Sequence, residues 1–180
     1  MTIYIALLRG INVGGNNKIK MAELKAAFEN LGLTRVQTYI QSGNILFESE
    51  EGAGALRLRI EQEIHAVFGI SLTVVLRTAE ELERMIQNCP FAAESLSAGQ
   101  SIHVSALTEP LSQQQIDLLS NGISEIDEVH IHGHEIYVLY GQSILDSKLA
   151  KNLQKLGGVV TTRNWNTMNK LAALAKAMKA

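Results

Sequence analysis

The residue types best suited to holding an anion gather near the start of the chain, in LLRGINVGGNNKIKM, residues 7–21. An apolar run leads into Arg9, and the loop after it holds Gly10, Gly14 and Gly15 before two lysines and a helical pattern. Glycine permits backbone conformations that other residues avoid and leaves amide N–H groups open to a ligand. The N-terminus of the following helix adds partial positive charge. The stretch therefore predicts an anion-binding loop.

A second polar stretch, TTRNWNT, covers residues 161–167 and contains the only tryptophan of the chain. The Arg163 guanidinium can fork onto a phosphate or carboxylate, and Trp165 offers a face on which a nucleobase stacks. A structural interpretation stands beside this one. Asn166 or Thr167 would be a good N-cap for a last helix, and a single tryptophan often anchors a core.

The first loop invites comparison with a phosphate-binding P-loop, G-x-x-x-x-G-K-[ST]. Gly10 and Gly15 have the required spacing, but Asn16 stands where the lysine belongs and no Ser or Thr follows it. Lys18 is displaced by two positions. The sequence thus argues against an NTPase and favours generic anion binding by loop amides with Arg9 and Lys18. The competing interpretation is a tight loop whose asparagine side chains bond its own backbone.

Charge is distributed unevenly along the 180 residues, although the formal net charge is only −2. Residues 1–22 and 148–180 contain lysine and arginine but no acid, so all eighteen acidic residues lie between them. Blocks of one sign commonly mark a surface for a charged partner. Alternatively, the basic ends neutralise the acidic middle within the fold. A hydrophobic content of 46% is enough for a core.

Apolar periodicity predicts an α+β fold of two consecutive ferredoxin-like (β-α-β-β-α-β) halves with antiparallel sheets, plus a C-terminal helix. In the first half we expect strands at 3–9, 36–40, 45–47 and 72–76, and helices at 21–31 and 55–68. In the second we expect strands at 102–107, 128–132, 135–140 and 159–162, and helices at 112–120, 148–156 and 168–178. A helix at 80–87 would connect them.

The predicted domains are an N-terminal ferredoxin-like subdomain at 1–77, a helical connector at 78–98 and a C-terminal α+β subdomain at 99–180. The first copy exceeds the second by about the length of the glycine-rich loop. An insertion confined to one copy of a repeat favours a functional role for the inserted segment.

Three motifs, RGINVGGNNKIKMAEL, YIQSGNILF and TTRNWNTMNKLAALA, resemble a widespread bacterial family known as domain of unknown function sixteen-ninety-seven. The resemblance implies a cytosolic two-part α+β protein and brings no activity, substrate or cofactor. The polar positions shared with the family are Arg9, Gly10, Asn12, Gly14, Gly15, Lys18, Ser42, Gly43, Asn44, Thr162, Arg163, Asn164, Trp165 and Asn166.

Other chemistry is less well supported by the sequence. His130 and His132 would share one face of a hairpin, but no third or fourth ligand stands close by, so we expect no metal site. Cys89 is the only cysteine, which excludes an internal disulfide and favours a reducing cytoplasm. No apolar run approaches the ~20 residues of a membrane span, and the apolar start is too short for a signal peptide.

Two functional hypotheses follow. The first is a protein that binds a phosphate-bearing ligand, a nucleotide or nucleic acid, with the loop at 10–18 and the TTRNWNT segment. The alternative is a small-molecule enzyme that acts on an anionic substrate in a pocket between the halves. No nucleophile–base–acid set can be assembled, since Ser42 lies in S-G-N. Under either hypothesis no cofactor is expected, and Arg9, Lys18 and Arg163 should lie on one face.

Overall fold

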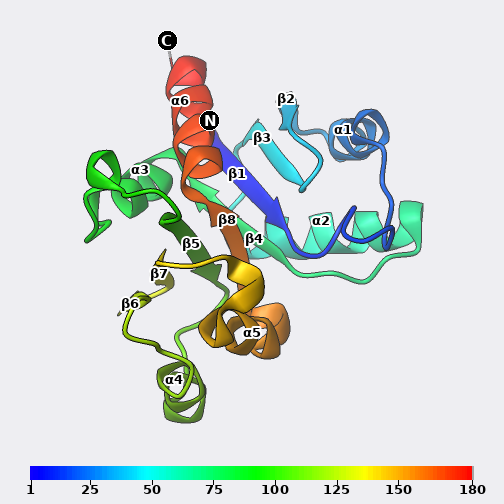
Figure 1. The fold of residues 1–180 in the computed structure, drawn as a ribbon. Helices are drawn as coiled ribbons and strands as arrows, with labels where there is room; N and C mark the ends of the chain where they lie inside the picture. Colours follow the sequence, from blue (N-terminus) through cyan, green and yellow to red (C-terminus); the bar gives the residue numbers. More distant parts are fainter. Residues whose placement is uncertain (180) are drawn as a thin grey trace. The chain divides into compact units, whose positions relative to one another are not determined.

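A computed structural model describes residues 1–179 of the chain (Figure 1). The chain divides into two compact units. The first unit comprises Met1–Arg84 together with the residues from Asn169 onward, and the second comprises Met85–Met168. Two helices, α3 (Ala79–Gln87) and α6 (Trp165–Lys179), each contain residues of both units.

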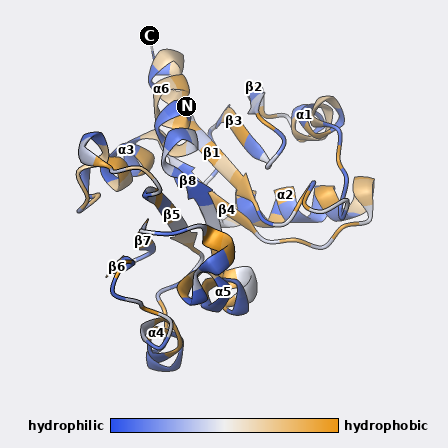
Figure 2. Ribbon diagram, in the orientation of Figure 1, coloured by the Kyte–Doolittle hydropathy of each residue, from blue (hydrophilic) through white to orange (hydrophobic). Residues whose placement is uncertain are grey.

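The first unit has a four-stranded antiparallel sheet with strand order β2-β3-β1-β4. Its elements are β1 (Thr2–Leu8), α1 (Met21–Asn30), β2 (Thr34–Tyr39), β3 (Asn44–Ser49), α2 (Ala53–Phe68) and β4 (Val74–Thr78). β1 lies between β3 and β4, and Figure 2 shows it in hydrophobic colours along most of its length. A central strand buried on both faces needs such a run.

The core of the first unit lies between one face of this sheet and the two helices. Leu24 and Phe28 of α1 and Ile60 of α2 pack with alternate residues of β1 and β3. Phe47 stands at the centre, where its ring lies 5.6 Å from the Phe28 ring and 5.7 Å from the Tyr4 ring. Helical residues three or four positions apart share a face, so this apolar spacing fixes which side of each helix meets the sheet.

The second unit repeats this arrangement with strand order β6-β7-β5-β8. Its elements are β5 (Ser101–Leu107), α4 (Gln113–Ser120), β6 (Glu128–His132), β7 (Glu135–Tyr140), α5 (Lys148–Lys155) and β8 (Val160–Asn164), with short 3-10 turns at Ala93–Ser95, Ile144–Asp146 and Gly157–Val159. Ser112 caps α4 in a capping box with Gln115, and Ser147 caps α5.

A buried carboxylate organises the connections of the second unit. Asp127 accepts hydrogen bonds from the Gly141 amide at 2.9 Å, from Gln142 Nε2 at 3.0 Å and from Ser147 Oγ at 2.9 Å. Ser147 in turn accepts from the Ala150 amide at the start of α5. One acid thus joins the residue before β6, the end of β7 and the cap of α5. Three donors satisfy a charge that would otherwise be costly to bury.

The predicted fold class is confirmed: two β-α-β-β-α-β halves with antiparallel sheets are followed by a C-terminal helix. The expected ranges for β6 and β7 match the structure, and most other ends differ by one or two residues. The predicted end of β8 and start of α6 were wrong. β8 continues to Asn164, whose Oδ1 accepts the Thr167 amide at 2.8 Å, so Asn164 is the N-cap in place of Asn166 or Thr167.

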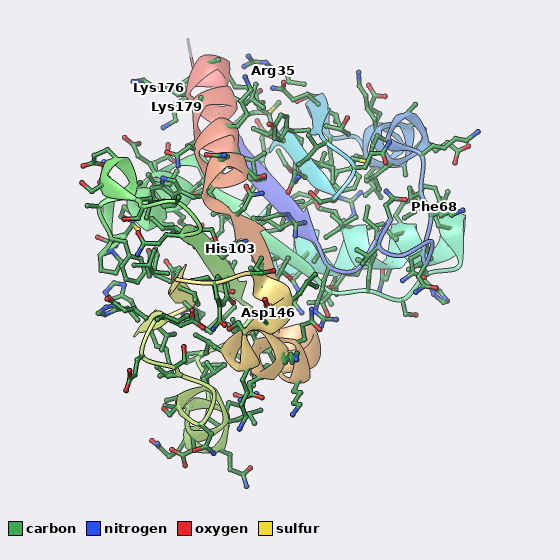
Figure 3. All side chains as sticks on the ribbon, viewed as in Figure 1. Arg35, Phe68, His103, Asp146, Lys176 and Lys179 are labelled. Carbon is green, nitrogen blue, oxygen red and sulfur yellow. The ribbon has the colours of Figure 1, made fainter. Side chains whose placement is uncertain are left out.

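We expected the last helix to belong wholly to the C-terminal subdomain at 99–180. In the structure its residues from Asn169 belong to the first unit. Arg35, beside the end of α6 in Figure 3, donates from Nη1 to the Met178 carbonyl at 2.7 Å. Lys179 forms a 3.0 Å ion pair with Glu80. Periodicity shows that a helix has an apolar face but does not show which sheet that face meets.

Across residues 1–179, no helix combines the length and the apolar character that crossing a membrane requires.

Candidate functional site

The loop between β1 and α1 is closed by the side chain of Asn12. Its Oδ1 accepts the Ile19 amide at 2.8 Å, and its Nδ2 donates to the Ile19 carbonyl at 3.1 Å. Nδ2 also donates to the Gln41 carbonyl, in the turn between β2 and β3, at 2.8 Å. The side-chain amide uses its oxygen and both donor hydrogens. Asn12 therefore ties the loop to itself and to the neighbouring turn.

Two glycines in the left-handed region form the tip of this loop. The φ angles of Gly14 and Gly15 are +58° and +80°, a region that glycine adopts at little cost. A tight turn closes around them through the Asn16 amide, and Asn17 Nδ2 donates to the Gly10 carbonyl at 3.1 Å. Over residues 1–179 the amides of Gly14 and Gly15 donate to no protein acceptor. The loop is therefore held by asparagine side chains while its tip presents bare amides.

The neighbouring turn is built as tightly. Asn44 is fully buried, and its Nδ2 donates to the Tyr39 carbonyl and to Ser42 Oγ, both at 2.9 Å. Gly43 has φ +90°, and a Cβ placed there would lie 2.8 Å from Ile11 Cδ1. The Ser42-Gly43-Asn44 motif thus packs a turn directly against the loop. Its side chains hold the backbone in place.

An open pocket of about 470 Å³ lies in the first unit, between the loop tip and the first turn of α1. Eight residues line it: Asn12, Gly15, Lys18, Ile19, Lys20, Met21, Glu23 and Gln41. Of the residues singled out from the sequence, the pocket brings together Asn12, Gly15 and Lys18. Arg9 is half-buried just after β1, where its amide donates to the Thr73 carbonyl at 3.3 Å.

The pocket is suited electrostatically to an anion. Lys18 and Lys20 are exposed, and neither has a carboxylate within ion-pair distance anywhere in residues 1–179. Lys20 is also the N-cap residue of α1, and it makes no side-chain capping bond. The first amides of α1 therefore keep their partial positive charge. Glu23 lines the same pocket and reduces this positive potential.

Sequence reasoning missed five pocket residues, the apolar Ile19 and Met21 and the polar Lys20, Glu23 and Gln41. Lys20 and Glu23 could have been found, because they directly precede and begin the predicted helix. Gln41 could not, since it reaches the pocket only through the packing of the turn against the loop.

Arg163, in the second unit, is buried in β8 opposite Val104 of β5. Its Nη1 donates to the Thr162 carbonyl at 3.0 Å. Only 9% of the residue is exposed, and this burial lowers the pKa of the guanidinium to about 10. It still carries its charge at neutral pH. The sequence suggested that Arg163 forms a bidentate hydrogen bond with a phosphate at the surface. That contact requires an exposed guanidinium, and this condition is not met.

Two other residues of TTRNWNT, Thr162 and Asn164, have local contacts. Thr162 Oγ1 lies 2.7 Å from the hydroxyl of Ser105, and Asn164 caps α6. Trp165 is half-buried at the first position of α6, and Asn166 is exposed beside it. That Arg9, Lys18 and Arg163 share a face stays a prediction, because Arg163 belongs to the second unit.

The residues of this loop and pocket lie within the range that a known family covers. A model of a family described as "Protein of unknown function (DUF1697)" matches residues 1–137. The chain belongs to this family. The match includes the glycine-rich loop, the Ser42-Gly43-Asn44 turn and every pocket residue.

The solved structure of a conserved bacterial protein from Streptococcus pneumoniae is similar to this member of the family over nearly its whole length. The two are 28% identical, the match covers 97% of this chain and 98% of that one, and the TM-score is 0.80. No curated protein matches the chain.

Proposed function

We propose that this protein binds a phosphate-bearing ligand, a nucleotide or the end of a nucleic acid, in the pocket of the first unit. The observation that carries the proposal is the lining of that pocket. Lys18, Lys20, the bare amide of Gly15 and the uncapped start of α1 all offer positive charge or N–H donors to one space. Phosphate oxygens are strong acceptors for such groups.

The site differs from the one expected from sequence. Asn12 and Asn44 serve the backbone, and Arg163 is buried in the other unit. We therefore assign binding to Lys18, Lys20 and Gly15, and positioning to Asn12, Ser42 and Asn44. Ile19 and Met21 give the pocket an apolar part that suits a base or sugar edge. Two lysines act as point charges and give electrostatic attraction without bidentate geometry.

The direct test is calorimetric titration with inorganic pyrophosphate, ATP and a short single-stranded oligonucleotide. Replacing both Lys18 and Lys20 by Ala should weaken binding by about a hundredfold or more, since each charge-assisted bond contributes about 1.5–3 kcal/mol. Lys25→Ala is the matched control, because Lys25 is exposed on α1 but does not line the pocket. Glu23→Gln should tighten binding by removing a like charge. If the double variant binds all three probes like wild type, the proposal is wrong.

The oligonucleotide arm also distinguishes the two ligand classes. Contacts to a nucleic-acid backbone release counterions, so affinity should fall steeply with salt, whereas a single terminal phosphate gives a shallow slope.

We further propose that each half is ferredoxin-like and that the protein works in the bacterial cytoplasm. The strand orders β2-β3-β1-β4 and β6-β7-β5-β8 support the first statement. The single cysteine and the similarity to a protein of Streptococcus pneumoniae support the second.

A further inference from the structure

The outer edge of the second sheet is a regular, exposed strand. β6 (Glu128–His132) is the first strand in the order β6-β7-β5-β8, and within residues 1–179 it pairs only with β7. The register with β7 runs through all five residues without a shift. Four of the five side chains are exposed, and Val129 is half-buried. An open edge offers a row of backbone N–H and C=O groups to another strand.

The equivalent edge of the first sheet is protected against such pairing. β2 occupies the same place in its sheet, but its register with β3 shifts between Thr34 and Gln37. Arg35 lies inside this irregularity with φ +52°, and its guanidinium binds Glu48 and the Met178 carbonyl. Bulges and charged residues are common devices that block edge strands. The two copies of the repeat thus differ: one edge is irregular and the other is regular.

The sequence of β6, EVHIH, is complementary to itself in an antiparallel arrangement. Glu128, His130 and His132 lie on one face, and Val129 and Ile131 lie on the other. If two copies pair with His130 opposite His130, each Glu128 lies opposite the His132 of the second copy. Each Val129 then lies opposite an Ile131. An imidazole N–H donates to a carboxylate in either protonation state, so both outer pairs are favourable.

The backbone is compatible with this register. Outward-facing N–H and C=O groups belong to alternate residues of an edge strand. A register centred on His130 pairs even-numbered residues with even-numbered ones and odd-numbered residues with odd-numbered ones. The outward-facing N–H and C=O groups of one copy therefore lie opposite those of the other and can form hydrogen bonds. Five residues per copy make a small interface, and the association should be weak and concentration-dependent.

We propose that a second copy of this chain pairs with β6 in antiparallel fashion, with His130 at the two-fold axis, to form a continuous sheet of eight strands. This dimer does not depend on the anion pocket, which lies in the other unit.

Disulfide trapping tests the register. In a Cys89→Ser background, His130→Cys should form an intermolecular disulfide with oxidised glutathione, since directly opposite residues lie about 4.5–5.5 Å apart. Val129→Cys and Ile131→Cys should each fail alone but cross-link when mixed with one another. Self-linking at 129 or 131 in place of 130 would overturn the proposed pairing. Circular dichroism checks that each variant is folded.

Sedimentation equilibrium with EDTA present, to exclude histidine-bound metal, tests the association in the native chain. Glu128→Lys should weaken the dimer by about tenfold, because it removes the carboxylate that accepts from His132 of the second copy, and this pair occurs twice. His132→Lys should maintain or tighten it. Glu125→Lys is the matched control, since Glu125 is exposed and lies outside the strand. A wild-type chain that stays monomeric at all concentrations, or an equal effect of Glu125→Lys, would overturn the proposal.

Discussion

Asn12 and Ile19, seven positions apart, are joined by two hydrogen bonds from one side-chain amide. Asn12 Oδ1 accepts the Ile19 amide and Nδ2 donates to the Ile19 carbonyl, the pattern that a strand neighbour would provide. The Asn12 side chain therefore replaces the backbone hydrogen bonds of a paired strand and joins the two ends of the loop. Ile19 is buried, so the loop is fixed to the core at the point where the pocket begins.

Asn12→Ala should lower the free energy of unfolding by about 2–4 kcal/mol, because three hydrogen bonds are lost and a positive φ of 56° becomes strained. Urea denaturation measures the change. Asn16→Ala is the control, since its exposed side chain makes no hydrogen bond in residues 1–179. Equal losses in the two variants would show that the Asn12 clamp has no special role.

Gly43 and Gly14 separate two reasons for a glycine. Gly43→Ala should cost about 2–4 kcal/mol, because the new Cβ would lie 2.8 Å from Ile11 and 2.9 Å from Leu8. Gly14→Ala should cost only about 1–2 kcal/mol, the strain of a left-handed residue in open space. Thermal melts of both variants give the comparison. A smaller loss at Gly43 than at Gly14 would contradict the packing of the turn on the loop.

Arg163→Ala should act on folding. Truncation removes a buried stem and the charge-assisted bond to the Thr162 carbonyl, at a cost of about 1–3 kcal/mol. Denaturant titration should show this loss, while Lys170→Ala, an exposed change on α6, stays within about 0.5 kcal/mol of wild type. A variant as stable as wild type, but with weaker pyrophosphate binding, would instead restore the sequence-based hypothesis of a ligand contact.

His103 gives the second unit a stability that depends on pH. Its Nδ1 is buried without a partner in residues 1–179, its ring packs edge-on against Tyr140, and burial lowers its pKa below the usual 6.5. The unfolded chain therefore binds a proton more readily than the folded one. The stability from neutral His103 is present above about pH 6.5 and is lost as the pH falls below it.

His103→Phe should flatten this dependence. Phenylalanine retains an edge-on contact with Tyr140 and removes the unpartnered nitrogen, which should add about 1 kcal/mol. Melting points measured between about pH 5 and 8 test the slope, and the values at about pH 8, where imidazole is neutral in both states, isolate the packing change. A variant whose melting point falls with acid as steeply as that of wild type would rule out His103 as the source.

Local patterns predicted the fold well, because the spacing of apolar residues and the positions of turn residues indicate each helix and strand of the two β-α-β-β-α-β halves. The hairpin at 128–140 is an example, since Gly133 separates the alternating EVHIH from the apolar run IYVLY and so defines both strands. The site was less predictable. A cluster of polar residues indicates that their side chains form hydrogen bonds. It does not distinguish an asparagine that binds a ligand from one, like Asn12, that binds the backbone of its own loop.

Arg163 shows the same limit from the other side. Its neighbours in the sequence are threonines and asparagines, a composition typical of an exposed segment. In the structure, however, Arg163 lies at a buried position of β8. Only the pairing of β8 with β5 decides this, and that pairing joins residues about sixty positions apart. Long-range contacts of this kind leave no local signal in a single sequence.

The residues from Asn169 onward complete the first unit, although the whole of the second unit precedes them in the chain. During synthesis residues 1–84 leave the ribosome before the second unit does, but the Met178 carbonyl that Arg35 binds is made only after that unit. The first unit therefore lacks its last helical segment while some eighty residues of the second unit are synthesised. During that time the part of its surface that this segment contacts stays uncovered. The unit that is translated first is the one that is finished last.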